Sequence, residues 1–213
     1  LIVGAGIAPD TPAVRHEFTA AGVPFERRVG RYMEGIRLCR ALWSGEPVTW
    51  EGRWSVTAGT LAPVPYRKSG PPIWSAATVS AGIERTAKHH DGWFPIGPDA
   101  GTFAQRNKEF RAAATAAGRN LDDLTTAIYL TVSIMDDSAD AEAAIDTYLE
   151  DYYSAPAAAL RKFQACKGGT EDQVVDFVRA FVQGGAQHLV IRCVGDHRSI
   201  QQILARRRDD LTV

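Results

Sequence analysis

A run of small and hydroxyl-bearing residues stands between a predicted strand over residues 73–77 and a predicted helix that begins at Ser80. Small side chains let a backbone approach a phosphate group closely, and the N–H groups at a helix start point toward an anion. The helix macrodipole adds to this attraction. A Ser80 that only caps the helix is the alternative. The predicted phosphate-binding residues are Ala76, Ala77, Thr78, Val79 and Ser80.

The apolar run at residues 1–3 leads into a second small-residue segment. An apolar run followed by glycine is typical of a buried parallel strand that meets a loop. Because Pro9 takes the third glycine position of a GxGxxG motif, we exclude a Rossmann-type turn. Contact with a bound ligand and a tight turn that needs positive φ are the two alternatives. The residues concerned are Gly4, Ala5, Gly6 and Ile7.

Charged and aromatic residues offer further candidates. A guanidinium suits a phosphate, but a solvated helix start explains at least two of Arg27, Arg28 and Arg31. The histidine pair at residues 89–90 is interpreted as structural, because adjacent residues at a helix end face different ways. No metal site is therefore expected there. The remaining candidates are His16 as an acid or base, Trp93, Phe94 and Tyr129 as pocket walls or core, and Arg192 as a ligand contact or half of a buried ion pair.

The composition excludes several classes of protein. The 213 residues carry 24 Lys and Arg against 25 Asp and Glu, for a net charge of −1, so no nucleic-acid surface is predicted. The apolar runs are too short to cross a membrane, and no signal peptide is expected. Cys39, Cys166 and Cys193 are widely spaced and odd in number, which favours free thiols and a cytoplasmic location.

The elements that must position these residues alternate along the chain. Strands are predicted over residues 1–3, 73–77, 92–96, 126–135 and 188–193, and helices over 29–43, 80–89, 103–117, 139–153, 170–182 and 199–207. The first of these helices has Arg31, Glu34 and Arg37 on its polar face. A hairpin is predicted over residues 48–61 and a proline-rich loop over 62–72. A helical piece over 160–166 precedes a break at 168–169, and residues 170 and 173 form a capping box.

This alternation predicts an α/β fold of parallel βαβ units, either an open doubly wound sheet or a closed barrel. A complete eight-unit barrel takes about 250 residues, and about five units are recognised in this chain. Because the chain also opens inside an apolar strand, we expect that further residues precede Leu1 in the complete protein.

Six phrases in register resemble the luciferase-like monooxygenase family, from its fourth strand to its last. They are VGAG at 3–6, AGVPFERR at 21–28, LWSGEPV at 42–48, PPIW at 71–74, DGWFP at 91–95 and HLVIR at 188–192. The resemblance implies that residues 1–213 are the C-terminal two-thirds of one (β/α)8 TIM barrel domain, with the hairpin at about 48–61 as an insertion. The family includes bacterial luciferase, FMN-dependent monooxygenases, and dehydrogenases or reductases that use coenzyme F420.

The resemblance also implies chemistry. It places the phosphate of a flavin or deazaflavin on residues 76–80, although many members have Gly-Gly where this chain has Ala76-Ala77 or Ala77-Thr78. It places residues 4–7 near the cofactor, and the catalytic His or Asp upstream of Leu1, so no catalytic residue is assigned. The expected activity is F420-dependent hydride transfer to or from a small organic substrate, in a homodimer. An FMN-dependent monooxygenase and a non-catalytic cofactor-binding subunit are the alternatives.

Overall fold

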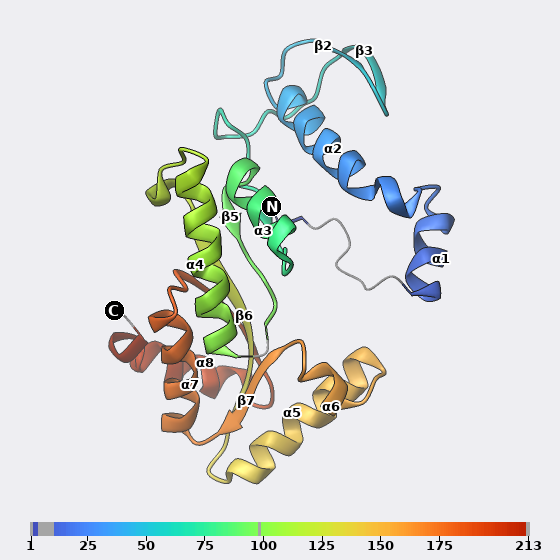
Figure 1. Ribbon diagram of the computed structural model, residues 1–213. Coiled ribbons are helices and arrows are strands. Elements are labelled where there is room, and N and C mark those ends of the chain that lie inside the picture. Colours follow the sequence, from blue (N-terminus) through green and yellow to red (C-terminus); the bar gives the residue numbers. More distant parts are fainter. Residues whose placement is uncertain (1, 4–10, 98, 212–213) are drawn as a thin grey trace. The chain divides into compact units, whose positions relative to one another are not determined.

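The computed structural model describes residues 2–3, 11–97 and 99–211, and the chain divides into two compact units, residues 1–73 and 74–213 (Figure 1). The described elements of the first unit are β1 (Ile2–Val3), α1 (Pro12–Ala20), a short 3-10 helix (Phe25–Arg27), α2 (Arg28–Leu42), β2 (Val48–Glu51) and β3 (Ser55–Gly59). The sequence did not predict α1. Its start carries the expected signals all the same, since Thr11 accepts a hydrogen bond from the N–H of Val14 at 3.4 Å and Pro12 is the first helical residue.

The predicted hairpin is present, because β2 and β3 pair antiparallel with Trp50 opposite Val56. A carboxylate from α2 holds its turn. Glu34 is buried and accepts hydrogen bonds from the backbone N–H of Arg53 at 2.6 Å and from the Arg53 guanidinium. The prediction that Glu34 lies on an exposed polar face is therefore wrong, because the hairpin turn closes over that side of the helix. That the hairpin is an insertion stays a prediction.

The second unit alternates strands and helices, as predicted. Its described elements are β4 (Trp74–Ser75), α3 (Ser80–His89), β5 (Gly92–Trp93), α4 (Ala100–Ala116), β6 (Thr125–Ile134), α5 (Ser138–Tyr153), α6 (Ala157–Leu160), β7 (Ala165–Gly169), α7 (Glu171–Gln183), β8 (His188–Cys193) and α8 (His197–Arg206), with 3-10 turns at Leu121–Asp123 and Arg208–Leu211. The capping box predicted for Thr170 and Gln173 is present at the start of α7.

The described strand pairs of this unit are parallel, and β6 is the central strand. Successive residues of a strand direct their N–H and C=O groups to opposite edges. Thr125 and Met135, at the two ends of β6, donate hydrogen bonds toward β5 and β7 respectively. The carbonyl of Thr126 instead accepts from Gln187, just before β8. Strands β5 and β7 therefore share one edge of β6, and the path β4-β5-β6-β8 adds strands in one direction.

One hydrophobic core covers one face of this sheet. Alternate residues of β6 are fully buried there against α3, α4, α7 and α8. This core includes Ile128, Leu130 and Val132 of the strand, with Ile83, Phe103, Phe110, Phe181 and Ile200 of the helices. Helices α3, α4, α7 and α8 thus lie on this face, whereas α5 packs against β6 and β7 from the other face.

The opposite face of the sheet is concave. Trp74 of β4 and His188 of β8 are three strand positions apart, which is roughly 14 Å on a flat sheet. Their ring centroids are nevertheless 5.1 Å apart. Gly92 contributes, because a Cβ there would lie 2.5 Å from the Trp74 ring and would stop the indole from leaning across β5. The sheet also curls toward this side, as a barrel wall does. We call it the inner face, and its residues include Trp74, Tyr129, His188, Val190 and Arg192.

The prediction of a helical piece over residues 160–166 and a break at Gly168-Gly169 is wrong. Residues 165–169 form β7, which pairs with residues 130–134 of β6. Glycine weakens a strand locally, but here α5 lies directly over it, and a Cβ on Gly168 would lie 2.4 Å from the backbone carbon of Ala141. The close approach of helix and strand thus requires glycine at this position.

Candidate functional site

A buried tryptophan supports the loop between β4 and α3 from beneath. Trp93 is 1% exposed and stacks on Phe103 and Phe110, with ring centroids 5.4 and 5.9 Å apart. Its Nε1 donates a hydrogen bond of 2.7 Å to the carbonyl of Ala77. Gly82 lets the loop sit on the first turn of α3, since a Cβ there would lie 2.9 Å from that of Ala77. Of the two roles that the sequence left open for Trp93, the structure shows the core role.

Helix α3 begins at Ser80, and Val79 is its N-cap in an extended conformation. The Val79 carbonyl accepts hydrogen bonds from the N–H groups of Gly82 and Ile83 at 2.8 and 2.9 Å. Within the described part of the chain, no side chain caps this helix start. The alternative in which Ser80 is the N-cap is therefore wrong. Because a first helical turn has N–H groups without intrahelical partners, this end of α3 is suited to an anion.

Arg106 of α4 lies beside this helix start. Its Nη1 donates to the hydroxyl oxygen of Ser80 at 3.2 Å and forms an ion pair with Glu109 at 2.7 Å. A cation is disfavoured at the positive end of a helix dipole, so a negative group is needed to stabilise it there. Glu109 supplies one such group, and a phosphate in front of the loop would supply another.

The sequence prediction missed Arg106. The residue is 26 positions from Ser80, and only the packing of α3 against α4 brings the two together. One signal was available. Arg106 comes three residues after Phe103 and four before Phe110, so a charged side chain flanks the inward stripe of α4.

The other predicted residues have different outcomes. Residues 4–7 lie outside the described residues, so cofactor contact by Gly4, Ala5, Gly6 and Ile7 stays a prediction. In the first unit, the guanidinium of Arg28 lies 3.7 Å from the Phe25 ring centroid, and that of Arg31 lies 4.6 Å from the Trp54 ring. These cation–π contacts give both arginines a structural role. Arg27 is exposed at the helix start.

The histidines are placed apart. His16 is exposed on α1 rather than in a loop, so its predicted position is corrected. His89 is exposed, whereas its neighbour His90 is buried, which agrees with the prediction that the two face different ways. Among the described residues, no three His, Cys, Asp or Glu side chains are grouped as metal ligands. Cys39, Cys166 and Cys193 are free thiols, and burial raises the pKa of the last two.

Arginine and tyrosine side chains meet on the inner face. The Nε of Arg192 donates a hydrogen bond of 3.1 Å to the Tyr129 hydroxyl. Its guanidinium carbon lies 5.9 and 6.0 Å from the ring centroids of Tyr148 and Tyr152 of α5. The partner of Arg192 in the described chain is thus a hydroxyl and not the carboxylate of a buried ion pair. Phe94 packs edge-on against the inner-face residue Trp74, with ring centroids 6.2 Å apart, and so belongs to the inner face as well.

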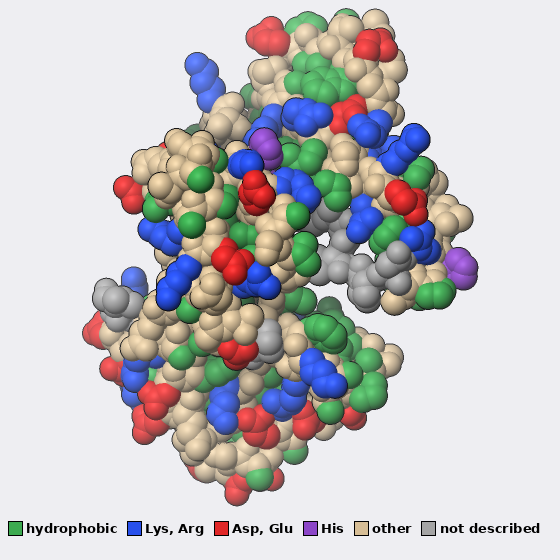
Figure 2. Space-filling model, viewed as in Figure 1, with side chains coloured by type: hydrophobic (Ala, Val, Ile, Leu, Met, Phe, Trp, Pro, Cys, Tyr) green, Lys and Arg blue, Asp and Glu red, His purple; other side chains and the backbone are tan. Residues whose placement is uncertain are grey.

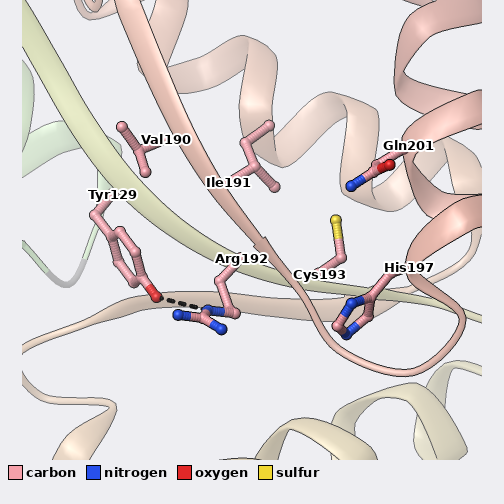
Figure 3. A pocket seen from close by; sticks show the side chains of 7 residues that line it. All are labelled: Tyr129, Val190, Ile191, Arg192, Cys193, His197 and Gln201. Atoms are coloured by element: carbon pink, nitrogen blue, oxygen red, sulfur yellow. Dashed lines mark hydrogen bonds between the residues drawn. The ribbon is translucent and has the colours of Figure 1, made fainter.

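A cavity of about 220 Å³ opens at β8 (Figure 3). In Figure 3, Tyr129, Val190 and Arg192 lie on one side of the strand, and Cys193, His197 and Gln201 lie toward α8. The cavity therefore reaches around β8 from the inner face to the first turn of α8. The sequence named Tyr129 and Arg192 as candidates, and the structure brings them into one site.

The chain belongs to the luciferase-like monooxygenase family, whose sequence profile matches residues 3–188. Among curated relatives, a phthiodiolone/phenolphthiodiolone dimycocerosates ketoreductase of Mycobacterium kansasii is 31% identical over 130 residues, which are 59% of this chain and 35% of the relative. An F420-dependent glucose-6-phosphate dehydrogenase of Rhodococcus erythropolis is 26% identical over 97% of this chain and 67% of its own length. The match to the ketoreductase thus spans about a third of that relative's length.

Solved structures share the fold. An F420-dependent secondary alcohol dehydrogenase superposes on the whole of this chain with a TM-score of 0.74 and 15% identity, and the match covers 69% of that protein. The predicted α/β fold of the luciferase-like barrels is thereby confirmed. The family consists of flavin- or F420-dependent oxidoreductases and monooxygenases. Of the helices in the described residues, none has the length and apolar character to cross a bilayer. Figure 2 shows Lys and Arg side chains interspersed with Asp and Glu on the visible face.

Proposed function

We propose that this chain is part of an F420-dependent oxidoreductase that transfers a hydride between the deazaflavin and a small alcohol or carbonyl substrate. The observation that carries the proposal is the match over 97% of the chain to a relative named as an F420-dependent glucose-6-phosphate dehydrogenase. The relative named as a ketoreductase supports the same chemistry, because its name describes the reduction of a carbonyl group.

The loop between β4 and α3 would anchor the phosphate of the cofactor. The small side chains of Ala76 and Ala77 leave the backbone accessible, and the hydroxyls of Thr78 and Ser80 add donors. The guanidinium of Arg106 already lies at hydrogen-bond distance from Ser80, so it would meet the same anion. These residues fit a phosphate, because several hydrogen-bond donors lie at this loop. The Arg106 guanidinium is paired with a single carboxylate, that of Glu109, and can therefore bind a further anion.

The inner face would bind the reacting end of the cofactor and the substrate. The bound cofactor supplies the redox chemistry, and the protein supplies its position and an environment shielded from water. Trp74 and Phe94 offer an apolar wall, and the Tyr129–Arg192 pair offers polar contacts. Carboxyl ends of parallel strands are where ligands of this fold bind, and β8 ends one residue beyond Arg192.

An FMN-dependent monooxygenase is the second candidate, favoured by the monooxygenase name of the matching family. The phosphate site would be the same, because FMN also ends in a phosphate. The two candidates differ in the cofactor ring and in the need for oxygen.

Equilibrium titrations of the full chain with F420 and with FMN, each oxidised and reduced and followed by cofactor fluorescence, test the proposal. We expect F420 to bind more tightly than FMN. The reverse preference favours the monooxygenase, and failure of both to bind below about 1 mM rejects a cofactor-dependent enzyme. Binding without turnover of any alcohol or ketone would indicate a non-catalytic cofactor-binding subunit.

A variant pair locates the phosphate. Arg106→Ala is expected to weaken cofactor binding about tenfold, the usual effect of losing one charged hydrogen bond. Arg111→Ala removes the same charge from an exposed position of α4 and is expected to leave binding unchanged. Equal effects of the two substitutions would place the phosphate elsewhere.

We also propose that the protein is a cytoplasmic homodimer, as members of this family commonly are. The free thiols of Cys39, Cys166 and Cys193 are in keeping with a reducing compartment. Light scattering coupled to size-exclusion chromatography would measure the mass in solution, and a monomer across the micromolar range would reject the dimer.

A further inference from the structure

The guanidinium of Arg192 is oriented but only partly used. Its Nε is bonded to the Tyr129 hydroxyl, and this contact fixes one edge of the planar group. The two terminal nitrogens make no hydrogen bond within the described residues. An arginine held in this way presents a fork of donors that matches a planar oxyanion.

Several other arginines of the second unit form ion pairs with carboxylates. Arg106 pairs with Glu109, Arg161 with Glu142 and Asp146, Arg179 with Asp176, and Arg207 with Glu171, Asp172 and Asp210. Arg192 is surrounded instead by hydroxyls and aromatic rings. Because none of these described partners is a carboxylate, the positive charge of Arg192 is available to a ligand.

A second donor without a partner lies nearby. The Tyr148 hydroxyl is fully enclosed and makes no hydrogen bond within the described residues. A buried polar group without a partner costs about 1–3 kcal/mol, so such groups are usually explained by a water or a ligand. The Tyr148 ring is one of the two beneath the Arg192 guanidinium. An anion at Arg192 would therefore lie beside two aromatic rings, while the enclosed Tyr148 hydroxyl is not among the groups that line the cavity.

The cavity beside Arg192 sets the size of the ligand group. Its volume of about 220 Å³ lies below the roughly 300–1,000 Å³ of sites that enclose a whole drug-sized ligand. The space suits the charged end of a small substrate and not a cofactor. One fixed positive charge also favours a group with one negative charge, because one guanidinium balances one carboxylate.

We infer that Arg192, positioned by Tyr129, is a specificity-determining residue that binds the carboxylate of the substrate, so that the substrate class is a keto or hydroxy acid. This inference rests on the proposed function for the reaction, but the binding of the carboxylate does not require the cofactor. Lys or Gln at this position would lack the planar fork of Arg.

Ligand-observed NMR on the cofactor-free full chain tests the binding. The probes are levulinate, which carries a ketone and a carboxylate, and its uncharged methyl ester. We expect levulinate to bind more tightly than the ester, and Arg192→Gln to weaken levulinate about tenfold to a hundredfold without affecting the ester. Arg192→Lys should lie between. Arg198→Gln, which removes a charge from an exposed position of α8, is the matched control and should behave as the unmodified chain.

Steady-state kinetics with reduced F420 separates the two proposals. If turnover occurs, Arg192→Gln should raise the KM for levulinate much more than it lowers kcat. Levulinate binding that depends on Arg192 in a chain that turns over nothing supports the carboxylate site and rejects the proposed reaction. Equal binding of acid and ester, unchanged binding in a folded Arg192→Gln variant, or tighter binding of methyl phosphate than of acetate would each overturn the carboxylate inference. Far-UV circular dichroism shows whether each variant is folded.

Discussion

Replacing Trp93 by Phe tests whether the core of the second unit supports the loop between β4 and α3. The hydrogen bond from Nε1 to the carbonyl of Ala77 is lost, at about 1 kcal/mol. The smaller ring leaves roughly 40 Å³ of space against Phe103 and Phe110, which costs ~1 kcal/mol at about 24 cal/mol per Å³. Because Trp93 is almost fully buried, the two losses should combine to about 2 kcal/mol of unfolding free energy.

Urea unfolding followed by circular dichroism measures this loss, and hydrogen exchange at the backbone amides of residues 78–81 reports on the loop. We expect faster exchange there and a weaker affinity for F420. Phe110→Leu is the control, since it perturbs the same core without a hydrogen bond to the loop. The reasoning is refuted if Trp93→Phe costs under about 0.5 kcal/mol, or if Phe110→Leu weakens cofactor binding as much as Trp93→Phe does.

Three further predictions concern the supporting structure. Asp99→Ala removes the N-cap of α4, whose carboxylate accepts from the Thr102 N–H at 2.7 Å, and should cost about 1 kcal/mol at pH 7 in chemical unfolding. That backbone hydrogen bond lowers the pKa of Asp99 from its usual 3.8, so the difference between variant and parent should shrink as pH falls through the lowered value, and a constant difference would exclude the carboxylate as its source. Gly168→Ala should cost about 2 kcal/mol through overlap with the backbone of α5, and an unchanged melting temperature would show that α5 does not pack on β7 in solution. Glu34→Gln should speed tryptic cleavage after Arg53, since the backbone hydrogen bond from Arg53 to this carboxylate is weakened, and equal cleavage rates would contradict the role of Glu34.

Local patterns in the sequence were sufficient for most elements of the second unit. The ranges predicted for α3 and β8 coincide with the structure, because capping, periodicity and β-branched runs act over a few neighbouring residues. The same is true of the capping box at the start of α7. The six phrases of the family resemblance were also local, and the match of residues 3–188 to the family confirms them.

The errors arose where distant segments meet. Glycines at residues 168–169 indicated a break, but the backbone of α5 lies so close that only glycine fits in β7. Glu34 was assigned to an exposed face, but the turn of the hairpin covers it. In both cases a tertiary contact outweighed the local propensity, and that contact is not encoded within a window of a few residues.

The sequence by itself determined the family, the α/β class and the loop at residues 76–80 as a candidate phosphate site. Only the tertiary structure decided which strands flank each edge of β6, the position of Arg106 beside Ser80, and the meeting of Tyr129 with Arg192 on the inner face. The physical reason is the same for all three. Each depends on which side of a strand or helix faces a partner 26 or more residues away, and that choice is made by the packing of the whole core.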